Sequence, residues 1–227
     1  MPRVGVFGGS FNPIHLGHLL LADEILELLQ LDRILFVPAG TPPQKPARGL
    51  APAPDRYAMT ELAIRGHPRF AISDLELRRP GPSYTVDTLE ALRREAGPDA
   101  ELYLLIGSET FLDLLSWRDP QRIARLARLV VMPRAGAPFD PEGIQAQKVL
   151  AEIGQERWIR IDPSRRSPVE IRGQGALLVA ATSLPISSSE LRRRAREGRS
   201  LAYRVPEAVR AYILERYLYR EEAQRLE

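Results

Sequence analysis

Apolar and polar positions near the start of the chain follow two periodicities in succession. Val4, Val6 and Phe7 form a short apolar run, which predicts a buried strand. From residue 19 to residue 29, leucine and isoleucine recur at helical spacing with acidic residues between them, which predicts a helix. Residues 8–18 join the two and read Gly-Gly-Ser-Phe-Asn-Pro-Ile-His-Leu-Gly-His. This stretch therefore predicts a unit of strand, glycine-rich loop and helix.

The same two patterns alternate along the rest of the chain. Further strands are predicted at residues 33–40, 70–77, 101–106, 129–132, 158–161 and 177–181. Further helices are predicted at residues 55–65, 84–93, 108–116, 120–125, 141–153, 186–197 and 206–219. This alternation predicts an α/β fold with a mostly parallel sheet and helices on both faces. Ligands of such sheets bind at the carboxyl ends of the strands, where the loops at Gly9, Gln44 and Gly107 are expected to meet.

Local capping signals mark several of the helix starts. Asp55 and Asp119 are predicted N-caps, and Asp140 repeats the pattern of Asp119 because a proline follows each of them. Ser187, with Glu190 three residues later, matches a capping box. The final helix is expected to pack against the protein through Val209, Tyr212, Ile213 and Tyr217.

The composition is that of a globular protein with a full core, since 44% of the 227 residues are hydrophobic. We therefore expect one domain over residues 1–227, in which residues 183–220 form a C-terminal helical part. The chain has no apolar stretch of membrane-spanning length and enters a strand at once, so neither a membrane span nor a signal peptide is predicted. The absence of cysteine excludes disulfides, thiolate zinc sites and a cysteine nucleophile, and it fits a cytoplasmic enzyme.

The net charge is +3, and the basic side chains are almost all arginines interleaved with glutamates. Such interleaving favours a mixed, solvated surface with a local anion site over a dedicated nucleic-acid surface. We therefore expect no nucleic-acid partner.

The loop at residues 8–18 is the first candidate site. A glycine-rich loop that opens a helix presents backbone N–H groups and the positive end of the helix dipole to an anion, which indicates a phosphate. His15 and His18 stand three residues apart at this helix start, so they share one face. Gly17 between them costs about 1 kcal/mol relative to alanine in a helix, which a closely approaching ligand would explain.

The residues of this loop give less support to a zinc site, a P-loop or a dinucleotide-binding loop. The two histidines could bind zinc, but no third ligand is evident nearby, so no resident metal site is predicted. The loop is not a P-loop, because no Gly-Lys-Ser/Thr follows, and it does not match the dinucleotide pattern Gly-x-Gly-x-x-Gly. His67 stands alone before a proline and is interpreted as a surface residue.

Two further features each have a structural and a functional interpretation. Residues 186–192 contain the capping box, yet a helix start with Arg192 one turn inside also suits a triphosphate. Trp117 follows a strand-end glycine and a short helix, a position suited either to the core or to a flat aromatic ligand.

Taken together, five blocks of sequence resemble the bacterial nicotinate-nucleotide adenylyltransferases, a branch of the HxGH nucleotidyltransferase superfamily. The blocks are residues 8–18, Pro42-Pro43-Gln44-Lys45, residues 83–89, residues 107–117 and residues 186–192. They run in family order over nearly the whole chain. The family loop usually reads Pro-Pro-His-Lys, so Gln44 is a departure, and Glu109 stands where aspartate is common.

This resemblance implies a Rossmann-like nucleotidyltransferase fold and transfer of AMP from ATP to nicotinate mononucleotide, giving deamido-NAD and pyrophosphate. Mg²⁺ would be carried by ATP, and the catalytic residues would be His15, His18 and Arg192. The residues that the resemblance assigns to ATP are Gly8, Gly9, Ser10, Phe11, His15, His18, Gly107, Glu109, Ile186, Ser187, Ser188 and Arg192. Those that it assigns to the acceptor substrate are Lys45, Tyr84, Thr85, Trp117 and Arg134.

Within these sets, Glu109 would lie by the adenosine ribose, Trp117 would stack on the nicotinate ring and Thr85 would help to bind its carboxylate. A homo-oligomer is compatible with the sequence, and a membrane partner is not expected. Two alternatives stay open. One is another HxGH adenylyltransferase, with phosphopantetheine or nicotinamide mononucleotide as acceptor, and the other is a nucleotide-binding sensor without catalysis.

Overall fold

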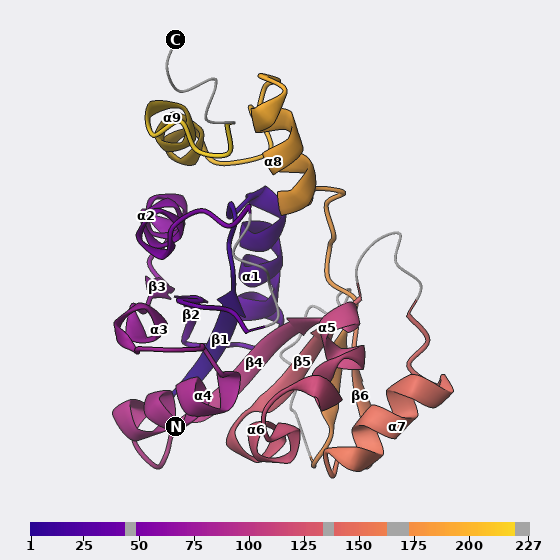
Figure 1. Cartoon of the computed structure of the whole chain (residues 1–227). Coiled ribbons are helices and arrows are strands. Elements are labelled where there is room, and N and C mark those ends of the chain that lie inside the picture. The colour runs from indigo at the N-terminus through magenta and orange to yellow at the C-terminus, as the bar shows by residue number, and fades with distance from the viewer. Residues whose placement is uncertain (44–48, 134–138, 163–172, 221–227) are drawn as a thin grey trace.

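A computed structural model of the chain describes residues 1–43, 49–133, 139–162 and 173–220 (Figure 1). Within these residues, one sheet has the strand order β3-β2-β1-β4-β5-β7-β6, and every pair of neighbouring strands is parallel. The strands are β1 (Arg3–Gly9), β2 (Arg33–Pro38), β3 (Phe70–Ile72), β4 (Glu101–Gly107), β5 (Arg128–Met132), β6 (Trp158–Ile161) and β7 (Ala176–Val179). The predicted α/β fold is confirmed, and its sheet is wholly parallel.

Helices cover both faces of this sheet (Figure 1). They are α1 (Leu16–Leu28), α2 (Ala53–Ile64), α3 (Leu75–Arg78), α4 (Thr85–Ala96), α5 (Ser108–Leu112), a 3-10 turn (Leu114–Ser116), α6 (Pro120–Leu126), α7 (Ile144–Glu152), α8 (Ser188–Arg196) and α9 (Glu207–Glu215). None of the helices in the described part of the chain has the length and apolar character that crossing a membrane requires.

Two buried clusters fill the space between the sheet and its helices. One contains Ile25 of α1, Met59 of α2 and Val209 of α9, and the other contains Leu89 of α4 and Val149 of α7. The side chains of β4 and β5 alternate between these clusters, as expected for parallel strands that are covered on both faces.

The strand order reverses between β1 and β4, which lie at the centre of the sheet. β1 pairs with β2 on one side and with β4 on the other, and their connections run in opposite directions. Gly8, Gly9 and Gly107 stand at the carboxyl ends of β1 and β4. Open parallel sheets bind ligands at this kind of switch point, so the topology directs attention to these glycines.

Of the three aspartates predicted to be N-caps, two do not cap a helix and one does. α2 begins at Ala53, and the Asp55 carboxylate is buried and accepts a hydrogen bond from the Tyr212 hydroxyl at 2.8 Å. α7 begins at Ile144, because the Asp140 side chain accepts from the Glu142 N–H at 3.0 Å and so closes a turn before the helix. Asp119 does cap α6, accepting from the Arg122 N–H at 3.0 Å.

The strand predicted at residues 70–77 is also wrong in its second half. β3 ends at Ile72, and the chain turns into the short helix α3. The Leu75 N–H donates to the Ser73 hydroxyl at 3.3 Å, and Glu76 is buried beside α4. The pattern of apolar residues predicts a strand here because it takes no account of the tertiary contact that the Glu76 carboxylate makes with α4.

The C-terminal segment packs on the first half of the chain. α9 lies against α2, where Val209 and Ile213 are buried as predicted, whereas Tyr217 lies past the helix and is 48% exposed. The Ser187 hydroxyl caps α8 by accepting from the Glu190 N–H, but the Glu190 carboxylate binds Arg193 at 2.7 Å, so half of the predicted capping box forms. The division into one domain with a C-terminal helical part stays a prediction.

Candidate active site

Two cavities adjoin at the carboxyl edge of the sheet. The first cavity, of about 520 Å³, lies between the ends of β1 and β4 and the starts of α1 and α8. The second cavity, of about 370 Å³, lies between the same strand ends, the loop after β2, the start of α4 and Trp117. The residues that line both cavities are Phe7, Gly8, Gly9, Ser10, Gly107 and Thr110. A ligand in one cavity can therefore meet a ligand in the other across the glycine-rich strand ends.

His15 and His18 form one stacked pair in the first cavity. His15 is the N-cap residue of α1, and its ring lies 3.7 Å from the ring of His18, measured between centroids. The His15 backbone N–H donates to His18 Nδ1 at 3.2 Å. Because Nδ1 accepts, the proton of the neutral His18 ring resides on Nε2, which makes Nε2 a donor. The rings of Phe7 and Phe11 pack against the His18 ring in T-shaped arrangements and hold it in place.

The structure gives a further reason why a glycine stands at position 17, besides the close approach of a ligand that the sequence suggested. A Cβ atom at this position would lie 3.1 Å from Nδ1 and 3.2 Å from Cε1 of His15. The His15 ring therefore occupies the space beside Gly17, and the glycine makes room for a neighbouring side chain. Gly17 also lines the first cavity, so the expectation that a ligand approaches its backbone stays a prediction.

The start of α8 is bound directly to the loop before α1. The Ser188 hydroxyl donates to the Pro13 carbonyl at 2.9 Å, and Arg192 donates to the Asn12 carbonyl at 2.9 Å. A second Arg192 nitrogen donates to the Ser189 hydroxyl at 3.2 Å, and burial lowers the pKa of this guanidinium. Two helix starts more than 170 positions apart in the sequence thus face one cavity. Ser187 caps the helix, so the structural interpretation of residues 186–192 is confirmed, and because Ser187 also lines the cavity, their functional interpretation stays a prediction.

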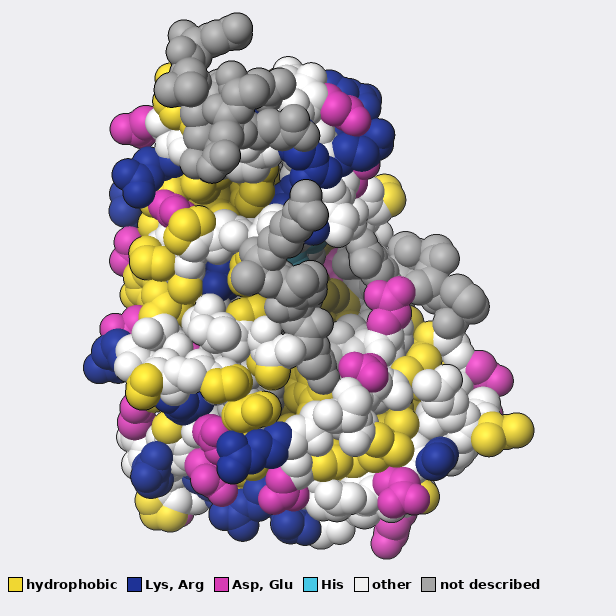
Figure 2. Space-filling model, viewed as in Figure 1, with side chains coloured by type: hydrophobic (Ala, Val, Ile, Leu, Met, Phe, Trp, Pro, Cys, Tyr) yellow, Lys and Arg dark blue, Asp and Glu magenta, His cyan; other side chains and the backbone are white. Residues whose placement is uncertain are grey.

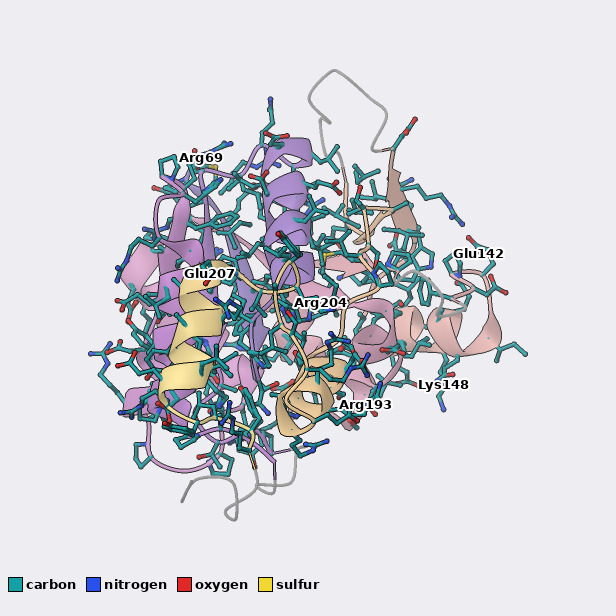
Figure 3. All side chains as sticks on the ribbon, turned by 90° about the horizontal axis from the view of Figure 1, so that it is seen from above. Arg69, Glu142, Lys148, Arg193, Arg204 and Glu207 are labelled. Atoms are coloured by element: carbon teal, nitrogen blue, oxygen red, sulfur yellow. The ribbon has the colours of Figure 1, made fainter. Side chains whose placement is uncertain are left out.

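The structure places every residue that the resemblance assigned to ATP on the wall of the first cavity. Glu109 is exposed at the start of α5. Arg193 lies on α8 and Arg204 on the connection to α9, and the Arg204 carbonyl accepts the Leu16 N–H at the start of α1 (Figure 3). Lys and Arg side chains gather around this C-terminal segment on the face seen in Figure 2.

Arg56 of α2 is a buried residue that sequence analysis did not single out. Its guanidinium donates to the carbonyl oxygens of Ser10 at 2.8 Å, Ala51 at 2.9 Å and Gly40 at 3.0 Å. The side chain is wholly buried, and this burial lowers the pKa of the guanidinium. Arg56 therefore joins the loops that follow β1 and β2, although nothing in its local sequence indicates such a role.

The second cavity has aromatic walls. Tyr84 and Trp117 line it together with Thr85, the first residue of α4. The indole N–H of Trp117 is buried and has no hydrogen-bond partner in the described part of the chain. Trp117 also packs against the buried cluster around α4 and α6, so it is partly a core residue and partly a cavity wall.

Arg118 and Glu76 are charged residues of this wall that sequence analysis missed. The Arg118 guanidinium lies over the Tyr84 ring, 4.9 Å from its centroid, and 3.5 Å from the Asp87 carboxylate. Glu76 lines the cavity from α3. The two other residues assigned to the acceptor, Lys45 and Arg134, lie outside the described residues, as does Gln44.

Within the described residues, no group of three or more His, Cys, Asp or Glu side chains is arranged to hold a metal ion.

His67 lies apart from the cavities: its ring stacks on Phe70 and Nε2 is 3.1 Å from the Asp23 carboxylate. The surface interpretation of His67 is thus only partly right, because the ring is packed and its side chain is 29% exposed.

Comparison with known proteins gives consistent matches. A model of the cytidylyltransferase-like family matches residues 6–194. A protein of Thermomicrobium roseum named probable nicotinate-nucleotide adenylyltransferase is 44% identical over 97% of this chain and 92% of its own length. A protein of Thermus thermophilus with the same name is 43% identical over 96% of this chain and 100% of its own length.

Solved structures agree in fold. The nicotinic acid mononucleotide adenylyltransferase of Plasmodium falciparum, complexed with NaAD, superposes with a TM-score of 0.72 at 20% identity. The match covers 96% of this chain and 98% of the other. At that identity, the likeness supports the Rossmann-like nucleotidyltransferase fold alone.

Proposed function

This chain belongs to the cytidylyltransferase-like family and, within it, to the nicotinate-nucleotide adenylyltransferases, and we propose that it adenylates nicotinate mononucleotide. The reaction transfers AMP from ATP and gives deamido-NAD and pyrophosphate. The observation that carries the proposal for this chain is the pair of adjoining cavities. One is bordered by two helix starts with His18 and Arg192, the other by Tyr84 and Trp117, and both share the glycine-rich strand ends.

The first cavity would bind ATP. The positive ends of the α1 and α8 dipoles and the side chains of His18 and Arg192 are suited to the triphosphate. The resemblance places Glu109 by the ribose, and its position on this wall is compatible with that role. The Ser188 hydroxyl donates to the Pro13 carbonyl and holds α8 in place, and the assignment of Ser188 to ATP stays part of the proposal because the residue lines this cavity.

Mg²⁺ would be bound mainly by the phosphate oxygens of ATP. Mg²⁺ retains several waters and is commonly held through substrate phosphates together with few protein carboxylates. Glu109 is the carboxylate of the first cavity within the described residues. This ion would neutralise phosphate charge, and it requires no dedicated protein site.

The second cavity would bind nicotinate mononucleotide. Its ring would stack on Trp117, and its carboxylate would approach Thr85 at the start of α4, where the helix dipole favours an anion. Arg118 adds a cation to the same wall. Lys45 and Arg134 stay in this proposal on the sequence resemblance alone.

Catalysis would consist of alignment and charge stabilisation. An oxygen of the acceptor 5′-phosphate forms a bond to the α-phosphorus of ATP, and the bond from that phosphorus to the β-phosphate oxygen breaks. Pyrophosphate leaves with the electron pair, and no general base is needed because a phosphate monoester is largely ionised near pH 7. His18 would donate from Nε2 to the phosphates, and Arg192 would stabilise negative charge in the transition state.

Pyrophosphate release tests the proposal against its alternatives. The protein would be incubated with ATP, Mg²⁺ and one acceptor at a time: nicotinate mononucleotide, nicotinamide mononucleotide or phosphopantetheine. We expect the highest kcat/KM with nicotinate mononucleotide. Higher kcat/KM with another acceptor would reassign the second cavity, and ATP binding without turnover on any acceptor would indicate a sensor. A cytoplasmic location and a homo-oligomer stay predictions from the sequence.

A further inference from the structure

Glu76 is an unusual residue for the wall of a cavity that is to receive an anion. It lies on the single turn of α3 and is only 7% exposed, although carboxylates are rarely buried without partners. Its hydrogen-bond partners come from α4 and from the segment that leads into this helix.

Two hydroxyl groups bind the Glu76 carboxylate. The Thr88 hydroxyl donates to Oε1 at 2.7 Å, and the Ser83 hydroxyl forms a second hydrogen bond. Burial raises the pKa of Glu76, while both hydrogen bonds and the nearby Arg79 oppose this rise. We call Glu76, Ser83 and Thr88 the Glu76 cluster.

Ser83 links this cluster to the other side of the second cavity. Its oxygen accepts the N–H groups of Gly40 and Thr41, each at 3.1 Å. These two bonds use both lone pairs of the hydroxyl, so its proton is directed to Glu76. The Ser83 N–H donates in turn to the Thr41 carbonyl at 2.9 Å. The loop after β2 is thereby bound to the segment immediately before Tyr84 and Thr85.

The backbone packing at this junction is equally close. A Cβ atom at Gly40 would overlap the Glu76 carbonyl oxygen and lie 3.3 Å from the Ser83 hydroxyl. Arg79 supports the same unit from outside, donating to the Thr88 hydroxyl at 3.1 Å and to the Asp87 carbonyl at 3.2 Å. The start of α4 and the loop after β2 are therefore held together through this cluster.

We propose that Glu76 is a positioning residue for the acceptor substrate, which fixes Tyr84 and Thr85 opposite the loop after β2 by joining the hydroxyls of Ser83 and Thr88. The proposal rests on the assignment of the second cavity to the acceptor. Glu76 acts through these two hydroxyls and takes no part in the first cavity, of whose wall it is not a member. Its loss should therefore weaken acceptor binding and spare ATP binding.

Glutamine can replace Glu76 in this role, and alanine cannot. The amide oxygen of a glutamine would accept from Ser83, which has no lone pair left to accept a proton. The amide N–H₂ would then face Thr88, whose own proton has a second acceptor in the Tyr84 carbonyl at 3.3 Å. Glu76→Gln thus keeps the cluster satisfied, while Glu76→Ala leaves the Ser83 proton without its partner.

Steady-state kinetics of the full chain test the proposal. The unmodified protein must first release pyrophosphate with nicotinate mononucleotide as the acceptor. For Glu76→Ala we expect the acceptor KM to rise about tenfold, with the ATP KM and kcat within about twofold. Glu76→Gln should restore the acceptor KM to within about threefold of the original value. Thr88→Val, which keeps the side-chain shape and removes one hydroxyl, should give an intermediate rise and serves if Glu76→Ala does not fold.

Tyr103→Phe is the matched control. The Tyr103 hydroxyl binds Arg3 and Glu101 near the amino ends of the strands, far from both cavities in the topology. The Tyr103→Phe substitution should lower the thermal stability and leave the KM for ATP and the KM for the acceptor unchanged. A parallel rise of both KM values in Glu76→Ala, or an unchanged acceptor KM, would overturn the proposal. An acceptor KM of Glu76→Gln as high as that of Glu76→Ala would overturn it too. The negative charge of Glu76, and not its hydrogen bonds, would then be what acceptor binding requires. No turnover by the unmodified protein would refute the proposed function instead.

Discussion

The two cavities of this protein are built in different ways. The first cavity takes its chemical groups mainly from two continuous stretches, residues 8–18 and residues 186–192, each of which opens a helix. The second cavity collects single residues and short runs from more elements: β1, the loop after β2, α3, α4, β4 and the segment around Trp117. Phosphate recognition needs backbone N–H groups and cations, which a short loop can supply by itself. A cavity for an aromatic ring needs walls from several elements.

The two cavities also differ in what holds them together. In the first, side chains of α8 donate to backbone carbonyls of the loop before α1, from Ser188 to Pro13 and from Arg192 to Asn12. In the second, the buried Glu76 cluster joins two segments through side-chain hydroxyls. Changes in the first cavity should therefore act mainly on catalysis, and changes in the second mainly on acceptor binding.

The largest effect should follow from His18→Ala. Loss of the Nε2 donor should lower kcat about 10²-fold, the usual cost of one charge-stabilising donor, while the fold is kept. Steady-state kinetics and thermal unfolding measure the two quantities. His67→Ala is the matched control, because His67 lies against Asp23 outside both cavities, and its kcat should not change. Near-normal turnover by His18→Ala would contradict the assignment of His18.

A smaller effect, of another kind, is expected for Trp117→Ala. Stacking of a ring on an aromatic side chain is worth about 1–3 kcal/mol, so the acceptor KM should rise about tenfold or more. The ATP KM should stay within about twofold, since Trp117 is not part of the first cavity. Trp117→Phe should recover most of the affinity. Equal increases in both KM values would mean that the core role of Trp117 dominates.

Gly17→Ala should separate stability from activity within the first cavity. Alanine favours the helix by about 1 kcal/mol, but its Cβ would lie 3.1 Å from His15 Nδ1 and displace the ring by a few tenths of an ångström. We expect kcat to fall about threefold to tenfold, together with unchanged or slightly higher thermal stability. Full activity would show that the position of the His15 ring is not critical.

The smallest kinetic effect is expected from Tyr212→Phe, which tests the region outside both cavities. The Tyr212 hydroxyl donates to buried Asp55 at 2.8 Å and helps α9 to dock on α2. Its removal should lower the free energy of unfolding by about 1 kcal/mol, measured by denaturant titration, with kcat and both KM values unchanged. A marked fall in kcat would instead show that the docking of α9 controls the first cavity through α8.

Local patterns in the sequence were sufficient to predict the α/β fold, most strand positions and the loop at residues 8–18, whereas the full set of residues around the first cavity came from the family resemblance. These features depend on neighbours in the chain: apolar alternation, the cap at Asp119, and a glycine-rich loop with two histidines at a helix start. Local signals failed at Asp55 and Glu76, where a polar side chain is recruited by a distant element. The apolar pattern around Glu76 was interpreted as a strand for the same reason.

Tertiary structure alone decided how the segments meet. Arg56 binds three carbonyl oxygens in two loops, and the Glu76 cluster binds the end of β2 to the start of α4. A buried guanidinium or carboxylate is stable only when other groups of the protein supply its hydrogen bonds, and here backbone and hydroxyl groups of distant segments do so. Those partners are adjacent in space and separated in sequence, so no pattern of neighbouring residues predicts them. Residues 8–18 and 186–192 therefore indicated the first cavity from the sequence, whereas the walls of the second cavity depend on contacts that only the fold creates.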